Sequence, residues 1–249
     1  MIADEIIAVM TSMRDEVQKE NLMRFFKTGE GQYGEGDEFL GLRSPQTREI
    51  VKKYYNKAEL SEVELLVKNK FHEIRLCGFL ILVEKYAKIK DKKPLDKMLK
   101  RDEIIRVYLK NSEFANNWDL VDMSAPKLLG KWFVDPSHIS EEEKINIIDN
   151  LAYSKNLWQR RISMVFSWWT TRQNRPDIAF KYALIHIGDK HDLMQKAVGW
   201  MLREVGKNCS YDLLREFLED NYSRLSRTSL RYAIEKFDEK ERKYWLEKI

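Results

Sequence analysis

One pattern recurs along this chain and limits its possible folds: an apolar helical segment with a charged residue near its start. Five segments share it, and they begin at His72, Asn117, Leu157, Leu193 and Arg227. Aligned by eye, their charged residues lie at intervals of 47, 39, 35 and 35 positions: Arg75, Asp122, Arg161, Lys196 and Arg231. Such intervals are typical of stacked helix pairs, in which each pair buries its apolar face against its neighbours.

Helix-breaking residues are scarce, which also favours helices. The 249 residues include only 5 Pro and 10 Gly, and both are unfavourable inside helices. Helix starts are indicated by Ser44 before Pro45 and by two capping boxes, Ser61 with Glu64 and Ser140 with Glu143. We predict an all-α fold, a right-handed α-solenoid of HEAT-like repeats. Because no segment marks a boundary, we expect a single domain over residues 1–249.

The aligned charges predict a basic concave face. Equivalent helices of a solenoid line one concave surface, and four of the five aligned residues are basic. Spaced Arg and Lys side chains suit the regular negative charge of DNA phosphates, although such contacts do not read base sequence. The alternative is that amphipathic helices simply carry charges at their edges, and a net charge of +4 permits an anionic partner without requiring one. The predicted DNA-binding residues are Arg43, Arg48, Arg75, Arg160, Lys196 and Arg231.

Tryptophans lie near Asp122, the acidic member of the row, and near one of its aligned equivalents. Trp118 precedes it by four residues, and Trp200 follows the aligned Lys196 by four. A Trp at helical spacing is usually a core residue, so core packing is the alternative interpretation. Pro126 removes the amide that would bond the Asp122 carbonyl, which predicts a local opening of the helix there. A carboxylate, an Arg and two or three indoles could converge on one concave pocket.

The sequence gives little support for a phosphate-binding loop, a metal site or a membrane span. The Gly-rich segment from Thr28 to Glu38 has no Gly-Lys-Ser/Thr sequence after it, so we interpret it as a flexible connector. The four His residues show no metal-ligand spacing, Cys77 and Cys209 are expected to be free thiols, and we predict no metal and no cofactor. No segment approaches the roughly 18 apolar residues of a membrane span, and the start of the chain has no signal-like pattern, so we expect a cytoplasmic protein.

Four segments together resemble the bacterial AlkD family of DNA alkylation-repair glycosylases, which have HEAT-like folds. They are LGLRSPQTRE from Leu40, NWDLVDMSAPKLLG from Asn117, NLWQRR from Asn156 and MQKAVGWMLRE from Met194. Their order and spacing agree with the family, and the resemblance covers nearly the whole chain. It implies that Asp122 is the catalytic carboxylate, that Trp118 and Trp200 are the flanking aromatics, and that Arg161 is the active-site arginine. Arg43 departs from the family pattern, which has a Gln there.

The resemblance implies excision of cationic alkylated purines, such as 3-methyladenine and 7-methylguanine, from duplex DNA. It also implies a lesion that stays largely stacked rather than flipped into a pocket. A non-catalytic binder of damaged or branched DNA would have the same basic face, but the family's four active-site residue types are all retained. A protein–protein scaffold is a further alternative, because fold does not fix function. We expect a monomer, since no self-complementary apolar stripe is evident.

Overall fold

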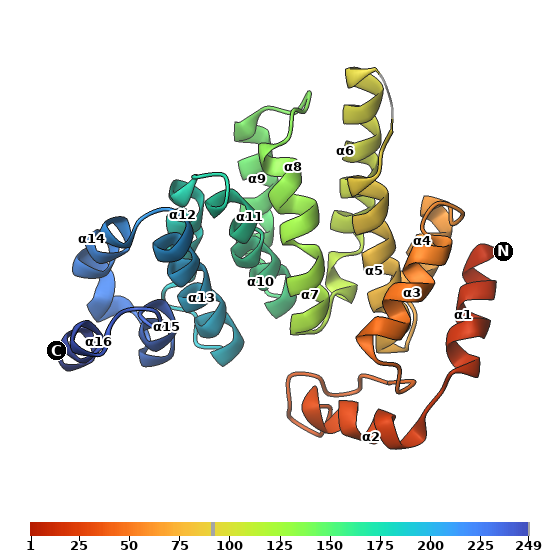
Figure 1. Ribbon diagram of the computed structural model, residues 1–249, viewed down its shortest axis with the longest axis horizontal. Helices are drawn as coiled ribbons and strands as arrows, with labels where there is room; N and C mark the ends of the chain where they lie inside the picture. Colours follow the sequence, from red (N-terminus) through yellow and green to blue (C-terminus); the bar gives the residue numbers. More distant parts are fainter. Residues whose placement is uncertain (91–92, 249) are drawn as a thin grey trace. The chain divides into compact units, whose positions relative to one another are not determined.

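The computed structural model describes residues 1–90 and 93–248, and the chain is all-helical there (Figure 1). Within these residues, extended backbone pairing is confined to one isolated bridge between Glu38 and Phe71. The chain divides into two compact units, which are described in turn. Unit 1 comprises residues 1–124 and 136–138, and unit 2 comprises residues 125–135 and 139–249.

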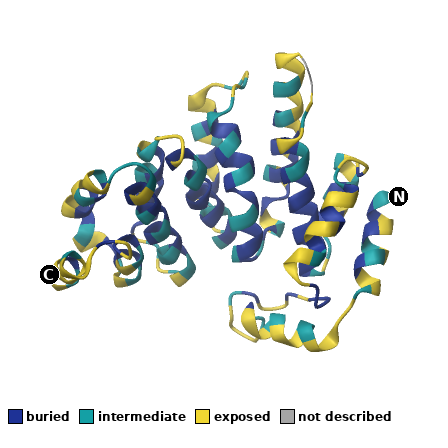
Figure 2. Cartoon of the chain, in the orientation of Figure 1, coloured by how far each residue is buried: buried dark blue, intermediate teal, exposed yellow. Residues whose placement is uncertain are grey.

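Unit 1 is a stack of two helical layers. Helices α3, α5 and α7 pack in sequence in one layer, and α1, α4 and α6 pack in the other, with α5 contacting both layers (Figure 1). Because α5 is covered on several sides, nearly all of its residues are buried (Figure 2). The elements of unit 1 are α1 (Ile2–Ser12), α2 (Glu16–Phe25), α3 (Ser44–Tyr54), α4 (Leu60–Val67), α5 (His72–Ala87), α6 (Pro94–Lys110), the 3₁₀ turn η1 (Ser112–Phe114) and α7 (Trp118–Ser124).

Unit 2 repeats this arrangement. Helices α10, α13 and α15 pack in sequence in one layer, α9 and α12 contact one another in the other, and α13 also packs against α12 and α14. The elements of unit 2 are the π-helical turn η2 (Pro126–Gly130), α8 (Lys131–Val134), α9 (Glu141–Ala152), α10 (Leu157–Val165), α11 (Ser167–Thr171), α12 (Pro176–His186), α13 (Asp192–Asn208), α14 (Tyr211–Asn221), the 3₁₀ turn η3 (Tyr222–Arg224), α15 (Arg227–Ala233) and α16 (Glu239–Glu247). Layered helix pairs of this kind are consistent with the predicted α-solenoid.

The predicted helix starts are partly confirmed. The Ser140 hydroxyl accepts from the Glu143 amide at 3.2 Å while the Glu143 carboxylate accepts from the Ser140 amide at 2.9 Å, so this capping box is present. The box predicted at Ser61 is wrong, because α4 already begins at Leu60 and its N-cap is Glu59. The sequence left this start ambiguous because Glu62 and Glu64 are both acidic, and either could be the third helical residue of a capping box.

Candidate functional site

Helix α7 presents Trp118 and Asp122 together. Trp118 is the first residue of α7, and its amide donates to the Asn117 side-chain oxygen at 2.9 Å. Asp122 lies four residues further, which places both side chains on the same face of the helix. Each is half-buried, in contrast to the fully covered Leu120 and Val121 between them. This face therefore offers an indole and a carboxylate one turn apart.

Trp118 forms one wall of an aromatic cavity in unit 1. Its ring stacks on Phe26 with centroids 5.4 Å apart and meets Phe25 edge-on at 5.8 Å. The cavity has a volume of about 290 Å³, and Phe39, Leu42 and Met123 are among its apolar lining residues. Phe25 is 61% exposed at its rim. An exposed ring beside Trp118 extends the apolar surface next to Asp122.

The backbone after Asp122 leaves α-helical geometry, as Pro126 predicts. Helix α7 ends at Ser124, and Pro126 begins the π-helical turn η2. There the Gly130 amide donates to the Ala125 carbonyl five residues back, at 3.0 Å. Single π-turns of this kind occur often at functional sites, because they re-aim nearby backbone and side chains.

Two arginines of unit 1 lie near this face. Arg43 is exposed at the N-cap of α3, and its amide donates to the Gln46 side chain at 2.7 Å. Arg48 is exposed one turn later, and its guanidinium Nη2 lies 3.7 Å from Met123 Sδ, next to Asp122 in the chain. Both side chains are accessible, as a phosphate contact requires; that they bind DNA stays a prediction.

The turn that leads to Arg43 is held by hydrogen bonds to a buried carboxylate. The buried Glu73 carboxylate accepts from the amides of Leu40, Gly41 and Leu42 at 2.9, 2.8 and 3.1 Å. Gly41 has a φ of +93°, and a Cβ there would lie 2.1 Å from the Asp15 carbonyl oxygen, so only glycine fits. The Leu40–Arg43 segment is thus held in one conformation.

The Gly-rich segment, which we interpreted as a flexible connector, is anchored to the interior at its last part. Its last part places Asp37 in the interior, 6% exposed, where the carboxylate pairs with Arg75 and lies 2.9 Å from His72 Nδ1. Burial opposes the charged carboxylate, but the bonds from His72 and Arg75 outweigh it and lower the pKa of Asp37. Composition revealed the glycines but not this long-range anchor.

Unit 2 supplies Arg161 and Trp200 from adjacent helices of one layer. Arg161 on α10 is 5% exposed, and its Nη1 donates to the Leu193 carbonyl in the first turn of α13 at 2.6 Å. Trp200 is half-buried on α13 and follows Gly199, where a Cβ would lie 2.4 Å from the Ser229 carbonyl oxygen of α15. The close approach of α13 and α15 fixes the backbone that carries Trp200. Whether this pair converges with Trp118 and Asp122 stays a prediction.

The helices confirm most of the aligned register. Asp122, Arg161, Lys196 and Arg231 are each the fifth residue of their helix, in α7, α10, α13 and α15 respectively. Arg75 is the fourth residue of α5, so it does not belong to the row, and Leu76 occupies the equivalent position.

Arg75 instead belongs to a second repeated feature, a brace of the preceding loop. Its Nη1 donates to the carbonyls five and six residues back, of Lys70 and Asn69, at 2.8 and 2.9 Å. Arg160 donates to Lys155 and Ser154 at 3.0 and 3.1 Å in the same way. Gln195 does so with Lys190 and Asp189 at 3.4 and 3.2 Å. All three are the fourth residue of their helix.

This brace corrects the predicted DNA contact of Arg75 and also engages Arg160. Arg75 is 4% exposed and pairs with the buried Asp37, so its guanidinium cannot reach a phosphate. Arg160 also pairs with Asp189, its Nε 2.8 Å from the carboxylate. Both guanidinium groups hold loops; we exclude Arg75 from the DNA-binding set, whereas the Arg160 side chain is 22% exposed and its contact with DNA stays a prediction.

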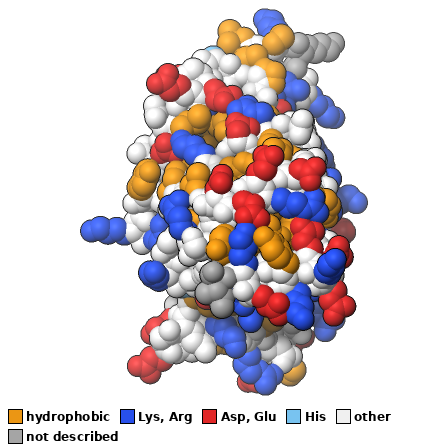
Figure 3. All heavy atoms as spheres, turned by 90° about the vertical axis from the view of Figure 1, so that its left-hand side faces the viewer, with side chains coloured by type: hydrophobic (Ala, Val, Ile, Leu, Met, Phe, Trp, Pro, Cys, Tyr) orange, Lys and Arg blue, Asp and Glu red, His pale blue; other side chains and the backbone are white. Residues whose placement is uncertain are grey.

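Lys196 and Arg231 keep accessible side chains. Lys196 is 39% exposed on its side chain and pairs with Asp192 one turn earlier at 2.7 Å, while Arg231 is exposed. A surface pair of this kind is weak enough for a phosphate to replace the carboxylate. Figure 3 shows the end of unit 2 that carries α14, α15 and α16, where basic and acidic side chains alternate. This end of unit 2 is therefore not uniformly basic.

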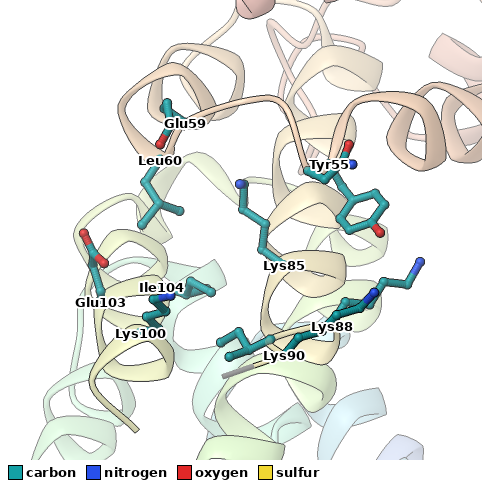
Figure 4. A pocket seen from close by; sticks show the side chains of 11 residues that line it. Tyr55, Glu59, Leu60, Lys85, Lys88, Lys90, Lys100, Glu103 and Ile104 are labelled. Atoms are coloured by element: carbon teal, nitrogen blue, oxygen red, sulfur yellow. The ribbon is translucent and has the colours of Figure 1, made fainter. Parts of the chain in front are cut away.

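A second cavity in unit 1 lies at the other end of α5 and contains none of the predicted residues. Its volume is about 400 Å³, and Tyr55, Leu60 and Ile104 are among its lining residues. Lys85 extends into it from α5 (Figure 4). Burial lowers the pKa of Lys85. This end of α5 is its C-terminus, where the helix dipole favours lysine side chains, so the Lys residues there have a structural explanation.

The described residues offer neither a metal centre nor a membrane span. They contain no group of three or more His, Cys, Asp and Glu side chains that could hold a metal ion. None of the helices described is long and apolar enough to cross a membrane.

A family profile described as DNA alkylation repair enzyme matches residues 6–237. A solved structure described as a predicted DNA alkylation repair enzyme from Enterococcus faecalis is similar with a TM-score of 0.65 and 15% identity, over 91% of this chain and 97% of that one. No curated protein matches. At this identity the structural likeness establishes the fold, and the profile match establishes the family.

Proposed function

Because this chain belongs to the family of DNA alkylation repair enzymes, we propose that it is a DNA glycosylase for cationic alkylated purines in duplex DNA. The substrates proposed are bases such as 3-methyladenine and 7-methylguanine. The observation that carries the proposal is the shared face of Trp118 and Asp122 on α7, beside an aromatic cavity and before a π-helical turn. Residues 1–249 would act as one functional domain.

The chemistry needs a carboxylate but no general acid. An N3- or N7-alkylated purine already carries positive charge, so it leaves as a neutral base when it takes the electron pair of the glycosidic C–N bond. Positive charge then develops on the deoxyribose, and ionised Asp122 stabilises it, as carboxylates do in glycoside hydrolysis. A water oxygen attacks C1′, and its proton passes to Asp122 and then to solvent.

The remaining residues bind and orient the nucleotide. The faces of Trp118 and Trp200 would attract the cationic sugar by about 0.5–2 kcal/mol each. Arg161 is 5% exposed and donates to the Leu193 carbonyl, and it would exchange that bond for one to a phosphate. Other phosphates along the duplex would be held by Arg43, Arg48, Arg160, Lys196 and Arg231.

One assay and one titration separate this function from its alternatives. Methylated duplex DNA is incubated with the wild-type protein, and released purines are quantified by chromatography. A gel shift at two salt concentrations measures DNA affinity in parallel. Base release together with salt-dependent binding supports the glycosylase. Binding without release would favour a non-catalytic DNA binder, and the absence of both would favour a protein–protein scaffold.

A further inference from the structure

A buried ionic cluster in unit 1 includes the residue that follows Trp118. It consists of Asp37, His72, Arg75 and Asp119, which are 6%, 2%, 4% and 4% exposed. His72 Nδ1 lies 2.9 Å from one Asp37 oxygen, and His72 Nε2 lies 2.9 Å from one Asp119 oxygen. The second Asp37 oxygen accepts from Arg75. Asp119 follows Trp118 in α7, whereas His72 begins α5.

This geometry favours the protonated form of His72 when both carboxylates are ionised. A neutral imidazole has one N–H donor and one acceptor nitrogen, whereas an imidazolium has two donors. Both ring nitrogens of His72 face carboxylate oxygens, which only accept when ionised. Two N–H donors are therefore required. With His72 protonated, the cluster holds two positive and two negative charges, and a buried cluster needs that balance.

Aromatic rings connect His72 to Trp118 by a second route. Phe39 stacks on the His72 ring with centroids 4.5 Å apart, and Phe26 lies 4.8 Å from it. Phe26 also stacks on Trp118, at 5.4 Å. Phe26 thus links the His72 ring to the Trp118 ring, and Asp119 links His72 to helix α7, which carries Trp118.

We propose that His72, as an imidazolium between Asp37 and Asp119, is a positioning residue that sets the orientation of Trp118 beside Asp122. This inference rests on the proposed glycosylase function for its effect on activity, but its structural part does not. His72 does not touch the reacting atoms. It anchors the first turn of α7 to α5, so losing its charge would leave Asp119 buried without a cation and release the turn that carries Trp118.

The test uses His72→Gln with a matched control. Gln retains a polar side chain that can bond one neighbour, but it has no charge. The control is His186→Gln in unit 2, because His186 is also buried, 3% exposed, with Nε2 2.8 Å from the Ser163 hydroxyl. Nitrogen-15 NMR of the indole N–H groups reports on Trp118, whose signal is assigned by its loss in Trp118→Phe. Base release is measured alongside.

We expect His72→Gln to move the Trp118 indole signal and to lower kcat about tenfold or more, with KM changed less than about threefold. His186→Gln should leave both unchanged. Asp37→Asn, on the far side of the imidazole from α7, should move the same indole signal, because it removes one of the two carboxylates that keep His72 charged. This second variant also serves if His72→Gln does not fold.

Two results would overturn the inference. One is a Trp118 signal that is unmoved in a folded His72→Gln or Asp37→Asn variant. The other is ring-nitrogen NMR of the wild type showing a neutral His72 at pH 7. Failure of the proposed function looks different: the wild type would release no base, while the shift of the Trp118 signal would still decide the role of His72.

Discussion

His72 Nε2 lies 2.9 Å from the carboxylate of Asp119, the residue that follows Trp118. Burial alone would lower the pKa of His72, but the Asp119 and Asp37 carboxylates outweigh it and raise the pKa to about 9, above the ordinary value of 6.5. A group whose pKa rises on folding stabilises the folded state below its unfolded pKa, and this stabilisation is lost as the pH rises through its folded pKa.

The stability that His72 contributes should therefore depend on pH. It should be complete below about pH 6.5, on the order of 3 kcal/mol, and should decline through about pH 9. Urea unfolding of the wild type and of His72→Gln at pH 6, 7.5 and 10 measures it. The difference in unfolding free energy between the two proteins should shrink toward pH 10; a difference that grows with pH would contradict the ionic cluster.

Arg75 and Lys196 should separate into a structural and a DNA-binding role. Arg75→Gln leaves Asp37 buried without its guanidinium partner, so it should lower the unfolding free energy by about 3–5 kcal/mol. Lys196→Gln removes an exposed charge and should change stability by less than about 1 kcal/mol. In DNA titrations Lys196→Gln should reduce the slope of log K against log salt by about 0.9. Arg75→Gln should leave that slope unchanged at temperatures where it is folded.

Gly199→Ala should affect the site through the backbone of α13. The added Cβ would lie 2.4 Å from the Ser229 carbonyl oxygen and 2.5 Å from Tyr232 Cβ, so α13 and α15 must separate. We expect a loss of stability of about 1–3 kcal/mol, as for other overpacked sites, and slower base release because Trp200 moves. Gly188→Ala is the control, since a Cβ there meets nothing within 4 Å. Equal behaviour of the two variants would count against this packing argument.

Arg161→Ala should weaken both DNA binding and base release. In the proposed site its guanidinium holds a phosphate, so its loss should also make the salt dependence of binding shallower by about 0.9. Because Arg161 is buried and bonds the Leu193 carbonyl, Arg161→Lys serves as a companion that keeps the charge. An Arg161→Ala protein that is folded and retains the wild-type salt slope would remove Arg161 from the DNA-binding set.

The sequence predicted the fold well where local pattern determines it. Helical periodicity and the scarcity of Pro and Gly predicted an all-helical chain, and Pro126 predicted the departure from α-helical geometry after Asp122. The spacing also placed four charged residues at the same helical position. These features depend on residues within one or two turns of each other, which a sequence displays directly.

The sequence failed where contacts are long-range. Arg75 was misaligned by one position, and its true role was hidden because its partner, Asp37, lies 38 residues away in a segment that composition describes as flexible. The buried cluster around His72 was missed for the same reason. A polar His-Glu pair at the start of the very apolar segment from His72 to Ala87 was the available signal, because charges inside such a helix need buried partners.

The central claim is that Asp122 performs the chemistry, and purine release from methylated duplex DNA tests it most directly. Asp122→Asn keeps the size of the side chain but removes its charge. Wild type and variant are compared in single-turnover release and in DNA affinity, with Asp220→Asn, an exposed carboxylate of α14, as the control. We predict that Asp122→Asn loses most release, by about 100-fold or more, and binds DNA nearly as the wild type does. Release by a folded Asp122→Asn at the wild-type rate would contradict the account.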